Sequence, residues 1–313
     1  MMSLPLRALT AFWPASRDRK PPMKVILVAG SGRSGTTWLG NIIAGDEWRI
    51  LFEPFNERRV PAVAGLGLRP YFHPTAAYPQ WHPVIERVLR GHITNAWTDK
   101  DRPRLKVSQS AGLLIKEIRV NGMLAWLDHH FHPTIVYIIR HPCAVIASRL
   151  QLQWDTPLEA ILAQPQLMRD YLAPYEPLVR GARSAVQKHA IMWCVENLIP
   201  LTQLAHHNWI CCTYEHLVLD PGQEIRRLLA QLQLPYSEAR AQAVEETSRT
   251  SWGRTAMEPQ HLLGDWQTRL DARAKQEIAA LLEAFAMTLY TVDDVLPHLP
   301  HTLDNQGHSP PLA

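Results

Sequence analysis

The sequence predicts an α/β protein, with a doubly wound parallel β-sheet flanked by helices in a single domain with insertions. Three observations support this fold class. Apolar, β-branched runs of strand length recur along the chain. Helical patterns alternate with these runs, which favours right-handed crossovers and a parallel sheet. The first run ends in a glycine-rich loop that leads into a helical pattern, an arrangement suited to binding anions.

The elements follow one another in strand–helix order. The segments Val25–Ala29 and Ile135–Ile139 are apolar and free of charge, which is typical of buried parallel strands. Pro142 fits the first turn of a helix. Strands are expected at Lys24–Ala29, Arg49–Phe52, Leu113–Ile118, Thr134–Ile139 and Trp209–Thr213. Helices are expected at Thr36–Ala44, Val120–His130, Val145–Gln153, Ser184–His206, Gly222–Gln233 and Asp271–Leu289.

The loop after the first strand carries Gly30, Gly32 and Gly35. Its spacing is P-loop-like, but Thr36 stands where the nucleoside-triphosphate P-loop has its lysine. That lysine normally reaches the β- and γ-phosphates, so its absence argues against a triphosphate ligand. The basic residue comes earlier, at Arg33, which suits one phosphate that carries one transferable anionic group. The alternative is a glycine turn without a ligand, which the cluster of charged and hydroxyl side chains in this loop disfavours.

A second motif follows the strand Thr134–Ile139. Arg140 stands where that strand ends, and Ser148 lies on the following helix. Ligands of open α/β sheets bind at the carboxyl ends of strands, so Arg140 is expected beside the glycine loop. The alternative is that Arg140 and Ser148 only cap and solvate the helix.

Together these motifs resemble the PAPS-dependent sulfotransferases. The family's loop of the form [KR]-S-G-T-T-W matches Arg33-Ser34-Gly35-Thr36-Thr37-Trp38. Its R-[DHN]-P strand end, with a serine eight residues after the arginine, matches Arg140-His141-Pro142 and Ser148. Two supportive segments are Thr213-Tyr214-Glu215-His216-Leu217 with Asp220-Pro221, and Gly264-Asp265-Trp266. The resemblance runs from about Lys24 to Trp266 in the family's order.

The resemblance implies PAPS as a co-substrate and no metal, because arginines and lysines neutralise the charge. Arg33 and the loop through Thr37 then bind the 5′-phosphosulfate, and Arg140 with Ser148 binds the 3′-phosphate. Trp38 and Tyr214 are expected at the adenine, the alternative for Trp38 being packing of the helix against the sheet. Ser248, Arg249 or Arg254 is expected to complete the 3′-phosphate clamp.

Two segments look more like the carbohydrate-type and bacterial branch than the cytosolic phenol and steroid branch. These are Leu51–Pro54 and Ile115–Arg119. The cytosolic enzymes carry a histidine two residues after the strand lysine, and here Ile118 stands two residues after Lys116. The usual histidine base is therefore missing from that position.

Glu53 is the preferred candidate for the base, because it follows the second strand directly. Its alternative role is structural, in an ion pair with Arg33 or Arg58. Lys116 is expected to reach the sulfuryl oxygens, and its alternative is an exposed lysine at a strand end. The reserve bases are His73, His92, His129 and His130.

The domain is expected to span residues 23–296, between an N-terminal leader at 1–22 and a proline-rich tail at 297–313. Segments 56–104 and 155–183 interrupt the strand–helix rhythm. The first is rich in aromatic residues, namely Tyr71, Phe72, Tyr78, Trp81 and Trp97. We expect acceptor-site walls and lids here, and the alternative is structural excursions that pack on the sheet.

Composition limits the partners. The formal net charge of +3 is too small to indicate nucleic acid, and 46% hydrophobic residues suffice for a core. The four cysteines have no zinc or disulfide spacing and are expected to be reduced in a cytoplasmic protein. No stretch has the apolar length of a transmembrane segment. The oligomeric state and the identity of the acceptor stay open.

The expected function is transfer of a sulfuryl group from PAPS to a hydroxyl of a small metabolite or sugar, releasing adenosine 3′,5′-bisphosphate. The alternatives are a P-loop nucleotide kinase or hydrolase, and a non-catalytic nucleotide-binding protein of the same fold. Thr36 in the lysine position and the absence of an acidic Walker-B strand end count against the kinase.

Overall fold

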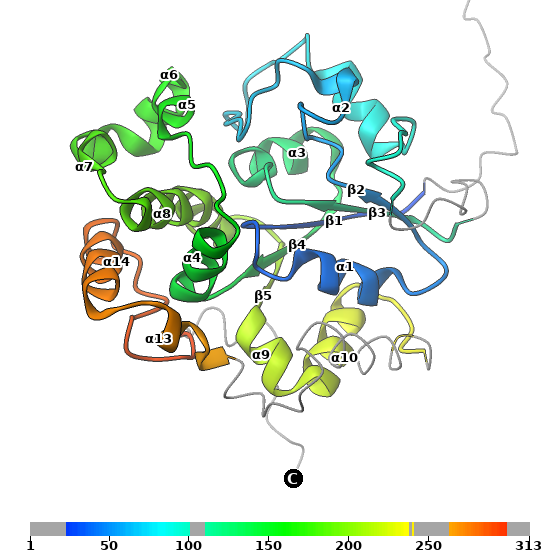
Figure 1. Ribbon diagram of the computed structural model, residues 1–313. Helices are drawn as coiled ribbons and strands as arrows, with labels where there is room; N and C mark the ends of the chain where they lie inside the picture. Colours follow the sequence, from blue (N-terminus) through cyan, green and yellow to red (C-terminus); the bar gives the residue numbers. More distant parts are fainter. Residues whose placement is uncertain (1–22, 101–109, 238–239, 241–262, 299–313) are drawn as a thin grey trace, which may run out of the picture.

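The computed structural model describes residues 23–100, 110–237, 240 and 263–298. Its centre is a sheet of five parallel strands in the order β2-β3-β1-β4-β5 (Figure 1). The strands are β1 (Val25–Gly30), β2 (Arg49–Phe52), β3 (Leu113–Glu117), β4 (Thr134–Ile139) and β5 (Ile210–Thr213). All five lie where the sequence predicted strands. The α/β fold class is confirmed, with helices on both faces of a parallel sheet.

Alternate residues of each strand enter two separate cores. On β1, Leu27 and Ala29 pack on one face, and Ile26 and Val28 pack on the other. All four side chains are fully buried, which explains why the strand reads as a continuous apolar run. The first core lies under α3 (Leu124–Phe131), α4 (Pro142–Gln151), α8 (Ala185–Leu204) and α14 (Ala272–Ala284). The second lies under α1 (Thr36–Ala44), α9 (Tyr214–Leu219) and α10 (Pro221–Gln231) (Figure 1).

Three predicted helices differ most at their ends, whereas α8 and α10 differ from Ser184–His206 and Gly222–Gln233 by at most two residues at either end. The segment predicted as Val120–His130 opens with a 3-10 turn at Asn121–Met123, and α3 follows it. Instead of Val145–Gln153, α4 runs from Pro142 to Gln151, because Pro142 fits its first turn and His141 Nδ1 accepts a hydrogen bond from Cys143 N at 3.1 Å. Instead of reaching Leu289, α14 ends at Ala284, and Ala286 has a positive φ of 52°.

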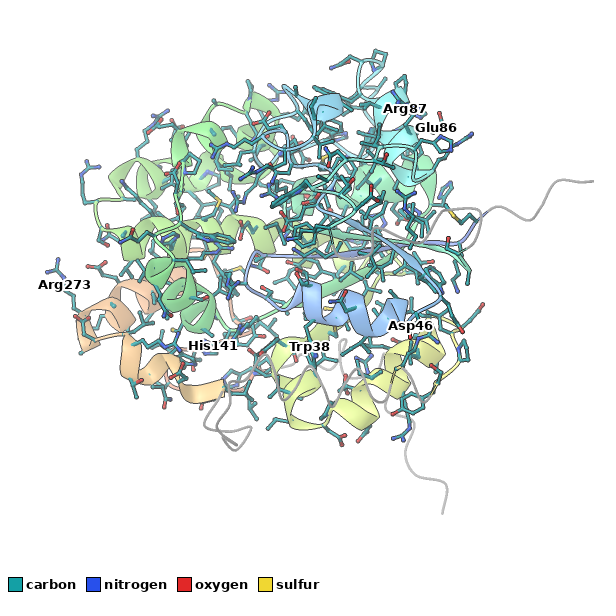
Figure 2. All side chains as sticks on the ribbon, turned by 45° about the vertical axis from the view of Figure 1, so that its right-hand side comes forward. Trp38, Asp46, Glu86, Arg87, His141 and Arg273 are labelled. Carbon is teal, nitrogen blue, oxygen red and sulfur yellow. The ribbon has the colours of Figure 1, made fainter. Side chains whose placement is uncertain are left out.

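The two insertions hold short elements that the sequence did not predict. The first carries a 3-10 turn at Pro61–Val63 and α2 (His82–Leu89), whose polar residues Glu86 and Arg87 lie at its surface (Figures 1 and 2). The second carries α5 (Leu158–Leu162), α6 (Pro165–Leu167), a π turn at Met168–Leu172, a 3-10 turn at Ala173–Tyr175 and α7 (Glu176–Gly181). A final short helix, α13 (Trp266–Arg269), precedes α14.

The aromatic residues of the first insertion pack mostly against one another and α3. Phe72 stacks on Tyr78 at 3.9 Å between ring centroids, and both contact Trp126 of α3 edge-on. Phe72 and Tyr78 therefore pack on a helix that covers the sheet. Trp97 differs, because it lies 5.2 Å from Phe52 at the end of β2.

Candidate active site

The glycine loop, the end of β4 and the ends of β2 and β3 surround one cavity of about 530 Å³. Its position at the carboxyl ends of the parallel strands is the one expected for a ligand site of an open α/β sheet. The predicted residues that line the cavity are Arg33, Gly35, Thr36, Thr37, Trp38, Glu53, Lys116, Arg140 and Tyr214. Residues far apart in the sequence therefore share one space, as the motifs predicted.

The glycine loop has a conformation that demands glycine at one position. Gly35 has a φ of +90°, and a Cβ built there would lie 2.7 Å from the ring of Tyr214. Arg33 also has a positive φ, 79°, which turns its side chain toward α4. Gly35 is the N-cap of α1, and no side chain caps this helix end. The backbone N–H groups of the first turn thus favour an anion at this point.

Arg33, Arg140 and Ser148 lie together, as the second motif predicted. Arg33 Nε donates to Ser148 Oγ at 2.9 Å, and Arg140 Nη1 donates to the carbonyl oxygen of Arg33 at 3.0 Å. Burial and the neighbouring Arg140 lower the pKa of the Arg33 guanidinium, whereas Tyr214 raises it. Two guanidinium groups held this close form a site of strongly positive potential.

Tyr214 and Trp38 form the wall on the β5 side of the cavity. The Arg140 guanidinium lies 4.0 Å above the Tyr214 ring, and Trp38 meets Tyr214 edge-on at 5.9 Å. Trp38 extends from α1 on the side of α9 (Figure 2). It is 7% exposed, so most of the indole serves helix packing, while its remaining edge lines the cavity.

Glu53 forms two ion pairs that the sequence did not predict. Lys116 Nζ lies 2.6 Å from Glu53 Oε1, and Arg119 Nη1 lies 2.7 Å from Glu53 Oε2. The expected alternative pairing with Arg33 or Arg58 is wrong. Burial raises the pKa of Glu53, but the charges and hydrogen bonds of Lys116 and Arg119 outweigh it and lower the pKa below its usual value. Glu53 is therefore a paired carboxylate.

The backbone at Glu53 is also unusual. Its φ is +43°, a conformation that non-glycine residues seldom adopt. The N–H of Glu53 donates to Lys116 O at 2.8 Å, which continues the β2–β3 ladder by one bond. The chain turns sharply directly after this bond. This turn is what sends the carboxylate back toward Lys116.

Lys116 is a buried residue, so the alternative of an exposed strand-end lysine is wrong. The residue is 5% exposed, and desolvation lowers its pKa although Glu53 opposes this effect. Lys116 pairs with Val28 of β1 on one side and Phe52 of β2 on the other. The strand register therefore places Lys116 at the cavity, with its ammonium against Glu53.

Several residues of the site were missed by the sequence reasoning. Arg119 fixes Glu53, and its position just after the end of β3 could have indicated a strand-end cation like Arg140. The buried carboxylate of Glu117 accepts from the N–H groups of Phe55, Ile118 and Arg119, and burial raises its pKa. The cavity is also lined by Gly32, Asn41, Phe52, Lys100, Ile118 and Trp154.

A buried polar network of α4 and α8 side chains contacts the glycine loop. Arg149 of α4 donates through Nη2 to Gly32 O at 3.1 Å and to Glu196 of α8 at 2.7 Å. Asn197 Nδ2 donates to Ser31 Oγ at 3.0 Å. Both α4 and α8 thereby fix the loop through its carbonyl and hydroxyl oxygens.

Of the two supportive sequence segments, the first lines the cavity through Tyr214, and both contact His141. Glu215, next to Tyr214, accepts from the His141 N–H at 2.9 Å and from Tyr290 Oη at 2.8 Å. Trp266 of the Gly264–Trp266 segment stacks on the His141 ring at 4.6 Å. Figure 2 shows His141 at the side of α4 that faces α13 and α14. These segments thus hold the Arg140 loop in place.

Some predicted residues do not line the cavity. Ser34 of the glycine loop is fully buried. Ser148 does not line the cavity and reaches it only through its hydrogen bond with Arg33. No histidine within the described ranges lines the cavity, so the reserve bases lie outside it. These are His73, His92, His129 and His130. Ser248, Arg249 and Arg254 lie outside the described residues.

The described part of the chain lacks two features. No helix there combines the length and hydropathy of a membrane-spanning segment. No group of three or more histidine, cysteine, aspartate or glutamate side chains there has an arrangement that could hold a metal ion.

No protein-family model matches the chain, and no curated protein matches it. Solved structures similar to it include the sulfotransferase domain of the Synechococcus olefin synthase, at 20% identity and a TM-score of 0.47, covering 87% of this chain and 98% of that chain. The sulfotransferase domain from the curacin biosynthetic pathway is 16% identical with a TM-score of 0.48, covering 85% of this chain and 99% of that one. A mouse sulfotransferase crystallised with PAP is 12% identical with a TM-score of 0.44, covering 84% of this chain and 85% of that chain.

Proposed function

We propose that this protein transfers a sulfuryl group from PAPS to the hydroxyl of a small metabolite or sugar and releases adenosine 3′,5′-bisphosphate. The observation that carries the proposal is the convergence of three groups on one cavity. These are the glycine loop with Arg33, the neighbouring Arg140, and the buried Lys116. Such a distribution suits a nucleotide with phosphate groups at two separate positions.

The chemistry of the donor set fits this nucleotide. Arg140 Nε is buried and has no hydrogen-bond partner among the described residues. Buried polar groups of this kind usually have partners, and Arg140 lines the cavity, so this atom points to a ligand with acceptor oxygens. Arg140 and Ser148 would hold the 3′-phosphate, and Arg33 with the N–H groups of Ser34–Thr37 would hold the 5′-phosphosulfate. Trp38 and Tyr214 would contact the adenine.

The chain supplies charge and position. PAPS, when bound, provides an activated sulfuryl group on a phosphate leaving group. Transfer of this type is helped mainly by position and by cations placed around the equatorial and leaving oxygens. Arg33 stabilises charge at the leaving phosphate, and Lys116 stabilises charge at the sulfuryl oxygens. No metal is required for this role.

Glu53 is the proposed acceptor of the hydroxyl proton. Within the described residues it is the carboxylate that lines the cavity, and no histidine does so. Its pairing with Lys116 makes it a weak base in the absence of an anion. An anion beside Lys116 competes for the ammonium, weakens this pair and raises the proton affinity of Glu53.

The kinase or hydrolase alternative is less well supported. Thr36 occupies the lysine position of the triphosphate loop, and β4 ends in Arg140 instead of an acidic residue. A non-catalytic role is disfavoured by the paired Glu53 and Lys116 in the same cavity.

Calorimetry with three nucleotides tests the proposal. Adenosine 3′,5′-bisphosphate should bind at least tenfold more tightly than AMP, because charge-assisted hydrogen bonds to the 3′-phosphate contribute ~1.5–3 kcal/mol each. ATP with Mg²⁺ should bind weakly. Arg140→Ala should remove the difference between the bisphosphate and AMP. Equal affinity of the unaltered protein for these two nucleotides would refute the assignment.

A further inference from the structure

The cavity extends across the sheet in the order of its strands. Tyr214 follows β5, Arg140 follows β4, the glycine loop follows β1, Lys116 lies on β3 and Phe52 ends β2. The nucleotide contacts proposed above occupy the β1, β4 and β5 side. The β2 and β3 side is thus the side open to the acceptor.

A short segment of the first insertion is fixed to the β2 side. The Phe52 N–H donates to Thr98 O at 2.8 Å, and Trp97 Nε1 donates to Glu53 O at 3.3 Å. Arg49 of β2 pairs with Asp99 at 2.9 Å. Residues 97–99 are thus fixed by three contacts, two with β2 and one with Glu53. These contacts place Lys100, which follows Asp99, in the lining of the cavity.

Lys100 differs from the other cations of the cavity. Lys116 is paired with Glu53, and Arg33 is hydrogen-bonded to Ser148. The Lys100 ammonium contacts aromatic rings, at 3.4 Å from the Phe52 centroid and 4.8 Å from the Trp97 centroid, and forms no ion pair with a described residue. A cation over aromatic rings is held weakly enough to exchange these rings for an anion.

The charges on this side favour a negative partner. Glu53 is the carboxylate among the described residues that line the cavity, and Lys116 and Arg119 together neutralise it. Lys100 adds a positive charge beside it that no described carboxylate balances. The adjoining walls, Phe52, Ile118 and Trp154, offer apolar surface to the body of an acceptor.

We infer that Lys100 forms an anion subsite for the acceptor, and that the acceptor is a hydroxyl compound bearing a carboxylate or similar negative group. This inference rests on the proposed function. Lys100 determines which acceptor binds and takes no part in nucleotide binding.

Matched acceptors that differ only in charge test the inference. The probes are para-hydroxybenzoate against para-hydroxybenzamide, and methyl β-glucuronide against methyl β-glucoside. Each is titrated by calorimetry into the protein saturated with adenosine 3′,5′-bisphosphate. In at least one pair the anionic member should bind about tenfold more tightly than its neutral partner, the effect of one charge-assisted contact.

Two variants assign the preference to Lys100. Lys100→Met should abolish the charge preference and leave the affinity for the bisphosphate within about twofold, whereas Lys100→Arg should retain the preference. Lys188→Met removes an exposed lysine of α8 and should change nothing. Added salt should weaken only the anionic probes, since screening acts on charge pairs.

Failure of the inference is distinguishable from failure of the proposed function. If the bisphosphate itself does not bind, the proposed function is wrong and the subsite falls with it. If it binds but neither anionic probe does, or both members of each pair bind equally, the inference alone is overturned. A large loss of bisphosphate affinity in Lys100→Met would overturn it as well, because Lys100 would then contact the nucleotide.

Discussion

Glu53 combines three properties at one residue. It is 5% exposed, it has a φ of +43°, and two cations contact its two carboxylate oxygens. Holding a non-glycine residue in this backbone region costs of order 1–3 kcal/mol, which the surrounding contacts must offset. Such strain gathers at functional positions, so it supports the role proposed for this carboxylate.

Replacing Glu53 by glutamine tests whether it receives the proton. Glu53→Gln keeps the size of the side chain and should lower kcat by about 10²–10⁴-fold, the usual effect of losing a general base. Affinity for adenosine 3′,5′-bisphosphate should stay near that of the unaltered protein. The measurements are turnover with PAPS and calorimetry with the bisphosphate.

A melting curve must accompany this assay, because the variant leaves Lys116 and Arg119 without their partner. A folded variant that keeps most of its turnover would show that another group removes the proton. Loss of bisphosphate affinity together with turnover would assign Glu53 to the positioning of Lys116 instead.

At the residue scale, sequence reasoning located the cations better than their partners. Arg33, Lys116 and Arg140 could be predicted because each borders a strand or loop of recognisable pattern. The pairing of Glu53 with Arg119 could not, because it depends on a sharp turn at Glu53 that no local sequence signal specifies. Lys100 was missed for a similar reason, since contacts with β2 about 50 residues away in the chain place it.

At the scale of elements, the start of α4 is held by a neutral histidine. His141 Nδ1 accepts from the Cys143 N–H, and Nε2 lies 2.9 Å from the carbonyl oxygens of Thr291 and Asp294. The ring is buried and stacked on Trp266. Desolvation lowers the pKa of His141 to about 4, although the two carbonyl groups oppose this effect.

This histidine makes stability depend on pH. Because its pKa is lower in the folded state than the usual 6.5, the unfolded chain takes up the proton first as the pH falls. The stabilisation is complete above pH 6.5 and is lost progressively toward about pH 4. Between about pH 7.5 and pH 5 the loss should be about 2 kcal/mol.

His141→Asn provides the comparison, since asparagine also caps helix N-termini. The variant should lose about 2 kcal/mol less stability than the unaltered protein over this range, as measured by urea unfolding at both pH values. Parallel pH profiles for the two proteins would contradict the prediction. His189, whose pKa burial also lowers to about 4, contributes equally to both profiles and cancels.

The order of the elements was predictable to a large extent, and the reason lies in burial. Every strand is enclosed between two cores, so its apolar run stands out in the sequence. Helix α2 was missed because its eight residues lie in a proline-rich segment. Helix ends were displaced where a single contact decides them, as the His141–Cys143 bond does at α4.

At the scale of the whole molecule, one buried carboxylate links the glycine loop to the first insertion. Glu196 of α8 binds Arg149, which holds Gly32 O, and it also pairs with Arg69 of the insertion. Burial raises the pKa of Glu196, but the two arginines outweigh it and keep the pKa low, so the side chain is ionised. Three segments far apart in sequence therefore depend on one charge.

Glu196→Gln should destabilise the protein by about 3 kcal/mol, because two guanidinium groups then lose a buried counter-charge. Bisphosphate affinity should also fall, since Arg149 no longer holds the loop as firmly. Chemical denaturation and calorimetry measure the two effects. Glu283→Gln, at an exposed position of α14, is the matched control and should change neither. A loss below about 1 kcal/mol would mean that the network contributes little.

The hydrogen bond between the Phe52 N–H and Thr98 O has a consequence for solubility. β2 is an outer strand of the sheet, and this bond occupies an N–H that points away from β3. Exposed outer strands invite pairing with strands of other molecules, which leads to aggregation. The segment around Thr98 covers this edge and also carries Lys100 to the cavity. Trimming that segment to admit larger acceptors would therefore expose a surface on which copies of the chain can associate.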